Sequence, residues 1–381
     1  MLYFYHFKLM REFVKILKIL CLFPLMLIYR SVVTFRNFLY DSKILKSHEF
    51  DMPIISVGNI SVGGSGKTPH TEFLIEMLQD EYQVAVLSRG YKRKTRGFRL
   101  VEADDSFLLS GDEPLQIKQK FPNAIVAVCE NRVKGISQLM SKFPDLKLII
   151  LDDAFQHRRV KPGLSILLNN FNHPINKDFL LPLGYLREPR SSAYRAHIVV
   201  FTKCPNKLKP IEKRILIKES EVYPYQYLFF TTYNYLDLKP VFNEDKKTIP
   251  ISDLKKYNVV LFSGLAKHTS LYNFFKENSK SVKHIKFPDH HNFKKRDIIK
   301  IEKEFKNTKE PSIIVTTEKD AVKLKDNKYF AEETKKMLYC ASIKVEQLGS
   351  EEDIKQFNNQ IFSYVRNNKR YCKLYKNAYS G

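Results

Sequence analysis

The chain has 381 residues, of which 44% are apolar, and it carries 64 Lys and Arg against 41 Asp and Glu, a net charge of +23. This length favours two domains over one, and the apolar fraction excludes an intrinsically disordered chain. The charge predicts an acidic partner: a nucleic acid, an anionic membrane surface or a phosphorylated substrate. Lysines spread over solvated faces would give the same total. Five cysteines without C-x-x-C spacing predict neither a disulfide framework nor a zinc site and favour a reducing, cytosolic environment.

Residues 1–40 differ in composition from the rest of the chain. Apolar residues dominate from 13 to 28, with lysines and arginines among and around them. The uncharged run 19–29 is shorter than the roughly 20 apolar residues that a membrane-spanning helix needs, and no small-residue cleavage site follows it. We therefore expect residues 1–45 to form a helical segment in the membrane interface, kinked at Pro24, in preference to a helix buried against the globular part.

A glycine-rich turn follows a β-branched run at residues 53–58 and precedes an apolar-periodic segment that begins at Phe73. Strand, turn and helix in this order are typical of a phosphate-binding loop, in which backbone N–H groups bind an anion. The general pattern G-x-x-x-x-G-K-[ST] has glycine where this chain has Ser61. Lys67 is predicted to stabilise the β- and γ-phosphates during catalysis, and the Thr68 hydroxyl to bind Mg²⁺. The predicted nucleotide-binding residues of this loop are Gly63, Gly64, Ser65, Gly66, Lys67 and Thr68.

Carboxylates elsewhere in the chain extend the predicted site. The apolar run 146–151 reads as a strand and ends in Asp152 and Asp153, which are typical of acids that hold Mg²⁺ beside a phosphate loop. Asp112 opens a predicted helix, where an acidic residue is most often a cap. The adjacent histidines at 290–291 fit a metal ligand or a proton relay, with zinc the weaker alternative.

These patterns predict an α/β fold. We expect a doubly wound sheet like that of P-loop nucleoside-triphosphate hydrolases at residues 46–222 and a smaller α/β domain at 223–381 that closes over the site. The aromatic, β-prone residues 223–233 are predicted to form an extended connector between the two domains.

The sequence resembles the tetraacyldisaccharide 4′-kinase family, the lipid A 4′-kinases of Gram-negative bacteria, from end to end. Ser61 belongs to that family's loop, whereas Ala154 stands where the family usually has glycine. The resemblance is carried by I-S-V-G-N at 55–59, S-R-G-Y at 88–91, G-D-E-P at 111–114, D-D-A-F-Q-H-R at 152–158, L-R-E-P at 186–189, F-P-D-H-H at 287–291 and T-E-K-D at 317–320.

The resemblance implies an ATP-dependent phosphotransferase that acts on the 4′-hydroxyl of an acylated disaccharide 1-phosphate at the cytoplasmic face of the bacterial inner membrane. It implies that Asp112 is a general base coupled to His290, and that Asp152 and Asp153 hold Mg²⁺ with Thr68. It also implies a set of residues around the nucleotide and its phosphates: Arg187, Glu188 and His157. Because Asp112 and His290 lie in different halves of the chain, we expect domain closure to join them.

Two alternatives belong to other classes. A P-loop GTPase or ATPase switch, or a metallochaperone-like protein, would share the phosphate loop; a guanine-reading loop [NT]-K-x-D, however, has aspartate where this chain has Pro205, which favours ATP. A nucleic-acid-binding ATPase would explain the charge, but no basic platform interleaved with aromatic residues supports it. We expect the partners to be the lipid substrate and the membrane surface, without nucleic acid, and the chain to be a monomer.

Overall fold

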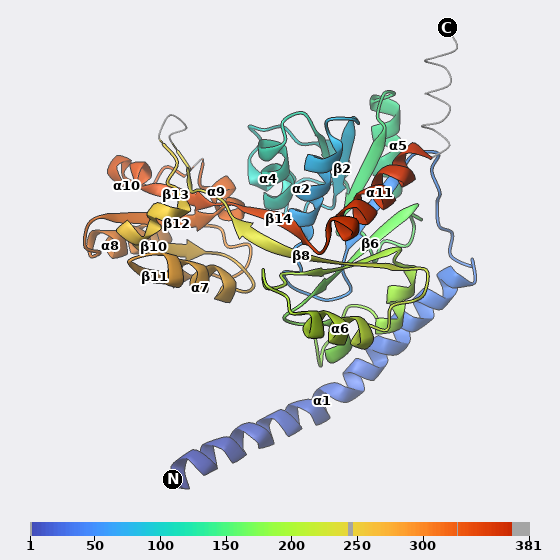
Figure 1. Cartoon of the computed structure of the whole chain (residues 1–381), viewed down its shortest axis with the longest axis horizontal. Helices are drawn as coiled ribbons and strands as arrows, with labels where there is room; N and C mark the ends of the chain where they lie inside the picture. Colours follow the sequence, from blue (N-terminus) through green and yellow to red (C-terminus); the bar gives the residue numbers. More distant parts are fainter. Residues whose placement is uncertain (1, 243–246, 326, 368–381) are drawn as a thin grey trace.

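The computed structural model describes residues 2–242, 247–325 and 327–367, and residues 2–18 by their backbone alone. The chain forms a nine-stranded and a five-stranded sheet, each covered by helices, and a long amino-terminal helix that extends away from the body (Figure 1). This confirms the predicted α/β fold. Four of the five cysteines are described and are free, and Cys372 lies outside the described residues.

The larger sheet has the strand order β14-β8-β7-β6-β1-β5-β2-β4-β3 and is parallel except at its two edges, where β14 and β3 run antiparallel to their neighbours. β1 lies in the middle of the sheet, between β5 and β6, so that Val57 pairs with Asp152 at their carboxyl ends. The strands are β1 (Ile54–Gly58), β2 (Val84–Ser88), β3 (Arg99–Leu100), β4 (Ile125–Val128), β5 (Leu148–Asp152), β6 (Leu164–Asn170), β7 (Ile198–Thr202), β8 (Tyr227–Tyr235) and β14 (Ile343–Leu348).

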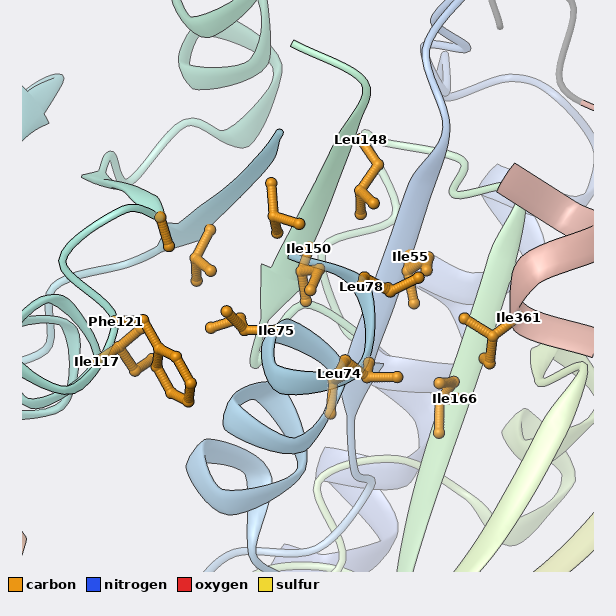
Figure 2. Close-up of a cluster of buried hydrophobic side chains, with 14 of the residues drawn as sticks. Ile55, Leu74, Ile75, Leu78, Ile117, Phe121, Leu148, Ile150, Ile166 and Ile361 are labelled. Carbon is orange, nitrogen blue, oxygen red and sulfur yellow. The ribbon is translucent and has the colours of Figure 1, made fainter. Parts of the chain in front are cut away.

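Helices cover both faces of this sheet because its strands are apolar on both sides. Ile55 faces the cluster formed with α2, α4 and α11, whereas its neighbour Ile54 faces the cluster formed with α5. Figure 2 shows the first cluster, with Leu74 and Leu78 of α2 beside Ile55. The helices that follow the strands of this part are α2 (Lys67–Leu78), α3 (Phe107–Ser110), α4 (Asp112–Lys120), α5 (Arg132–Lys142), α6 (Pro210–Glu219) and α11 (Glu351–Arg366), with 3-10 turns at Ile175–Lys177 and Arg190–Arg195.

The smaller sheet has the order β11-β10-β12-β13-β9, with β10 to β13 mutually parallel. Helices again cover its two faces: α8 packs on the side of Phe262, and α7 on the side of Leu261. Its elements are β9 (Lys239–Pro240), β10 (Asn258–Ser263), α7 (Thr269–Asn278), β11 (Ser281–Lys286), α8 (Lys295–Lys306), β12 (Ser312–Thr317), α9 (Glu318–Leu324), α10 (Glu332–Lys336) and β13 (Leu338–Ala341), with a 3-10 turn at Ile251–Lys256.

The segment predicted as a connector is a strand instead. Most of residues 223–233 fall in β8, which pairs in parallel with β7 and antiparallel with β14. The chain then builds the smaller sheet and returns through β14 and α11, whose Phe357 and Ile361 are buried in the core of the larger sheet. The chain therefore passes from the larger sheet to the smaller one near residue 238 and returns near residue 342. The predicted boundary lay between residues 222 and 223.

The amino-terminal segment is one helix, α1 (Leu2–Asp41), which continues through Pro24. Its second half lies against the body through buried Met26, whereas side chains such as Phe35 and Phe38 are exposed. The stretch Ile19–Asp41 is long and apolar enough to cross a membrane by length and composition alone, although the uncharged run within it had suggested otherwise. Most side chains of Ile19–Asp41 are exposed, so this part of α1 is not a core helix.

Candidate functional site

The predicted phosphate loop lies between β1 and α2, at the carboxyl edge of the larger sheet. Gly66 caps α2 with φ +90°, and a Cβ at this position would lie 1.6 Å from the Tyr233 hydroxyl oxygen, so this residue must be glycine. Gly63 also has a positive φ, +102°. Lys203, after β7, donates to the Gly64 carbonyl oxygen at 2.7 Å and holds the loop from its other side.

Two cations converge on the second of the paired aspartates. Lys67 Nζ lies 3.7 Å from Asp153 Oδ2, and an Arg187 guanidinium nitrogen lies 3.0 Å from Asp153 Oδ1. Arg187 also donates to the Asn59 carbonyl oxygen in the loop. Burial raises the pKa of Asp153, but the charges of Lys67 and Arg187 outweigh burial and bring it below its ordinary value. The structure thus places three predicted site residues in direct contact.

Asp152 is buried and faces α2 and β2. Its carboxylate accepts hydrogen bonds from the Thr71 hydroxyl at 3.3 Å and the Ser88 hydroxyl at 3.5 Å. Burial raises the pKa of Asp152 above its ordinary value, and the charges of Glu113 and Asp153 raise it further. Thr68 lies one helical turn before Thr71 on α2, so its hydroxyl projects from the same side of the helix.

This donor set fits Mg²⁺. Hard oxygen ligands gather at the phosphate loop, and a nearby cation would offset the repulsion between two carboxylates. Within the described ranges no cluster of three or more His, Cys, Asp or Glu side chains is suited to a metal ion. The protein would therefore supply few ligands, which agrees with the way Mg²⁺ is usually held, by one or two carboxylates together with phosphates and water.

Asp112, from the part of the chain with the larger sheet, contacts His290, from the part with the smaller sheet. Asp112 is the first residue of α4, His290 follows β11, and His290 Nδ1 lies 2.8 Å from Asp112 Oδ2. Lys319 Nζ donates to His290 Nε2 at 3.1 Å, so the ring donates from Nδ1 and accepts at Nε2. The pair is therefore already joined in this conformation, and the expected domain closure stays a prediction.

The Asp112 carboxylate is ionised at neutral pH. It is 5% exposed, and burial raises its pKa, but the hydrogen bond from His290 and the positive charge of Lys319 outweigh burial and bring the pKa to about 2. The expectation that Asp112 caps its helix is wrong, because Gly111 is the N-cap of α4; Asp112 Oδ1 instead accepts the backbone N–H of Glu113 at 3.0 Å.

One cavity of about 930 Å³ brings most of the predicted residues together. Both sheets contribute to its wall, and so does α1 through Tyr29, Val33 and Arg36. The predicted site residues that line it are Gly63, Gly64, Lys67, Asp152, Asp153, His157, Arg187, Glu188 and His290. The other four adjoin wall residues in the chain or contact them: Ser65, Gly66, Thr68 and Asp112.

Two of the wall residues have partners that bear on their predicted role. Burial and the nearby Arg132 charge lower the pKa of His157 to about 4, so its imidazole is neutral. The buried Glu188 carboxylate contacts Arg195 and lies 3.9 Å from Arg36 of α1. The structure therefore shows Glu188 joining α1 to the cavity wall.

Sequence reasoning missed several residues of the site. Lys319 bridges Glu113, Asp289 and His290, although it stands in a stretch that carried the family resemblance. Arg132 is 2% exposed and donates to the Asp152 carbonyl oxygen at 3.1 Å. A cation in the first turn of a helix opposes the helix dipole, and this unfavourable placement is the signal that could have revealed Arg132.

Comparisons with known proteins identify the family of this chain. The family model described as Tetraacyldisaccharide-1-P 4′-kinase matches residues 18–362. The chain is similar to the tetraacyldisaccharide 4′-kinase of Bacteroides thetaiotaomicron, with 45% identity over 94% of this chain and 96% of that protein. It is also similar to the one from Phocaeicola vulgatus, with 45% identity over 92% of this chain and 96% of that protein.

A solved structure is similar along almost its whole length. It is an "apo" form of LpxK from Aquifex aeolicus in complex with ATP, which matches with a TM-score of 0.69 and 31% identity over 90% of this chain and 98% of that one. The sequence matches cover the phosphate loop, the paired aspartates and the Asp112–His290 pair alike. This chain therefore belongs to the tetraacyldisaccharide-1-phosphate 4′-kinase family.

Proposed function

We propose that this protein is an ATP-dependent kinase that phosphorylates the 4′-hydroxyl of a tetraacyldisaccharide 1-phosphate in lipid A biosynthesis. The observation that carries the proposal is that a phosphate loop and an Asp–His pair meet at one cavity, in a chain whose relatives bear this activity as their name. The alternative GTPase switch lacks support, because Pro205 stands where a guanine-reading loop has aspartate.

The nucleotide end of the cavity would hold the ATP phosphates. The loop N–H groups and Lys67 would bind the β- and γ-phosphates, with Arg187 as a second cation. Thr68 and Asp152, with Asp153, would hold Mg²⁺, which when bound neutralises charge on the phosphate oxygens. Lys67 and Arg187 already lie against the Asp153 carboxylate, which supports a role in binding anionic oxygens at this point.

The Asp112–His290 pair would orient the acceptor hydroxyl and take its proton. His290 occupies Asp112 Oδ2, so Oδ1 offers a lone pair beside the one used by the Glu113 N–H. A pKa of about 2 makes Asp112 a weak base. Because phosphoryl transfer passes through a loose transition state, alignment of the hydroxyl matters more than early removal of its proton.

The amino-terminal helix would bring the kinase to its lipid. Exposed apolar side chains on α1, together with basic residues near it, fit an anionic bilayer surface, here the cytoplasmic face of the bacterial inner membrane. Tyr29, Val33 and Arg36 on the same helix line the cavity, so a lipid headgroup beside α1 would lie next to the reaction site. A monomer suffices for this arrangement.

The decisive experiment measures ATP consumption with and without the acylated disaccharide 1-phosphate, with GTP in parallel. We expect turnover that requires the lipid and prefers ATP. Hydrolysis without lipid together with a preference for GTP would instead support the switch.

Substitution of the acid in the Asp–His pair tests its role. We expect Asp112→Asn to lower kcat by about 100-fold or more, because the hydroxyl loses its proton acceptor, with little change in KM for ATP. The control is Asp104→Asn, which removes an exposed carboxylate nearby. An unchanged kcat in Asp112→Asn would exclude Asp112 as the base.

A further inference from the structure

Helix α9 of the smaller sheet lies against α4 of the larger one, and charged pairs join the two helices. Glu318 of α9 lies 3.5 Å from Lys120, and Lys319 lies 3.1 Å from Glu113. The third pair is the most buried, with Lys323 Nζ 3.4 Å from Asp112 Oδ2. The two sheets thus meet through alternating charges at the end of the cavity where the Asp–His pair lies.

Lys323 is held firmly in place. Its side chain is only 2% exposed, and its Nζ donates to Asp320 Oδ1 at 2.9 Å and to the His291 carbonyl oxygen at 3.3 Å. Asp320 is itself fully buried, and its other oxygen accepts the Gly264 N–H and the Thr317 hydroxyl. Lys323 is therefore anchored within the smaller sheet, and Asp112 is its contact in the larger one.

Lys323 approaches the Oδ2 oxygen of Asp112. Lys323 and His290 both approach Oδ2, whereas Oδ1 receives the Glu113 backbone N–H. The hydrogen bond from His290 and the positive charge of Lys323 at the same oxygen hold the carboxylate in one orientation and leave Oδ1 for a further partner. We propose that Lys323, anchored by Asp320, is a positioning residue that presents Asp112 Oδ1 to the acceptor hydroxyl. This inference rests on the proposed role of Asp112 in the kinase reaction.

A purely structural role is the weaker explanation for this lysine. Burying an ion pair costs desolvation that its Coulomb attraction often fails to repay, so an apolar side chain of similar size would stabilise the interface as well. The groups that face Asp112 from the packed elements are His290, Lys319 and Lys323, with Glu113 beside it on α4. Lys323 is the one among them that combines contact with Asp112 and almost complete burial.

The experiment uses the full-length protein and the double variant Lys323→Met, Asp320→Asn, which removes both buried charges and leaves neither unpaired. We expect kcat to fall by about 100-fold, the size associated with a misplaced reacting group, with KM for ATP within about twofold. The acidic limb of the pH profile should move to higher pH, because a cation that lowers the pKa of Asp112 is lost. Lys323→Arg, which keeps the charge, should recover part of kcat.

Further variants distinguish a role in positioning Asp112 from a structural role. Lys325→Met removes an exposed charge from the end of the same helix and should leave kcat and the pH profile unchanged. In an Asp112→Asn background the double variant should cause little further loss, because Lys323 acts through Asp112. Wild-type kcat and pH profile in the folded double variant, or an equal loss in the Asp112→Asn background, would overturn the proposal. An Asp112→Asn variant with normal activity would instead refute the proposed base, whatever Lys323 does.

Discussion

At the scale of single residues, the phosphate loop depends on one glycine and one tyrosine from a distant strand. Gly66 needs its positive φ to begin α2, and the Tyr233 hydroxyl of β8 occupies the space that a side chain would require. The sequence predicts the glycine from the loop pattern alone. It cannot predict the tyrosine, because β8 reaches the loop only through the order of the strands in the sheet.

Adding a methyl group at residue 66 tests this packing. Gly66→Ala should destabilise the fold by about 1–3 kcal/mol through backbone strain and steric overlap and should weaken ATP binding. Gly97→Ala is the matched control, because Gly97 has a similar φ, +77°, with no atom within 4 Å of the added Cβ. Urea unfolding and nucleotide titration measure both effects. Equal losses of unfolding free energy and ATP binding in the two variants would show that backbone strain alone causes the effect. The Tyr233 side chain would then move away from the added methyl group.

Buried charges mark the limit of prediction from local sequence. Lys67, Asp152 and Asp153 belong to patterns whose spacing carries their chemistry, and the structure brings them together as predicted. Arg132 and Lys323 belong to no such pattern. Their roles depend on burial and on partners more than 15 residues away, such as Asp152 and Asp112, which only the folded chain reveals.

At the scale of elements, the strands and helices near the nucleotide follow from apolar runs and turns, whereas the edge of the larger sheet does not. β8 and β14 pair with each other although more than 100 residues separate them. An isolated β-prone segment has no local mark that distinguishes a connector from a strand, because pairing decides which it becomes. For that reason residues 223–233 were predicted as a linker.

Substitutions on helix α1 test its contact with a membrane. Phe35 and Phe38 lie on one side of the helix and are 62% and 57% exposed. Replacing both with serine should weaken partitioning onto anionic vesicles by about 100-fold or more, because each buried phenyl ring contributes about 2 kcal/mol. Co-sedimentation measures this. Ile299→Ser on α8, also exposed, is the control, and undiminished pelleting of the double variant would contradict membrane contact through α1.

At the scale of the whole molecule, the two sheets are held together by charges that also form the reaction site. Asp112 belongs to one sheet, and its partners His290, Lys319 and Lys323 belong to the other. One group of these joining contacts therefore depends on the ionisation of the buried Asp112 carboxylate.

Acid should loosen this junction in a measurable way. The pKa of Asp112 is about 2 in the fold and 3.8 ordinarily, so the carboxylate stabilises the protein by about 2 kcal/mol above pH 4 and loses this effect as the pH falls toward 2. Between pH 6 and pH 3 the wild type should lose about 1 kcal/mol more unfolding free energy than Asp112→Asn does. Urea denaturation measures the difference at each pH, and a difference that does not change with pH would contradict the assignment.

Arg36 connects helix α1 to the wall of the cavity. It lies on α1, donates to the Gln156 carbonyl oxygen at 2.9 Å and approaches Glu188 in the cavity wall. A tilt of α1, set by bilayer thickness or curvature, would move that wall and change the shape of the cavity around the phosphates. If α1 contacts the bilayer as proposed, we expect turnover to depend on bilayer thickness and curvature.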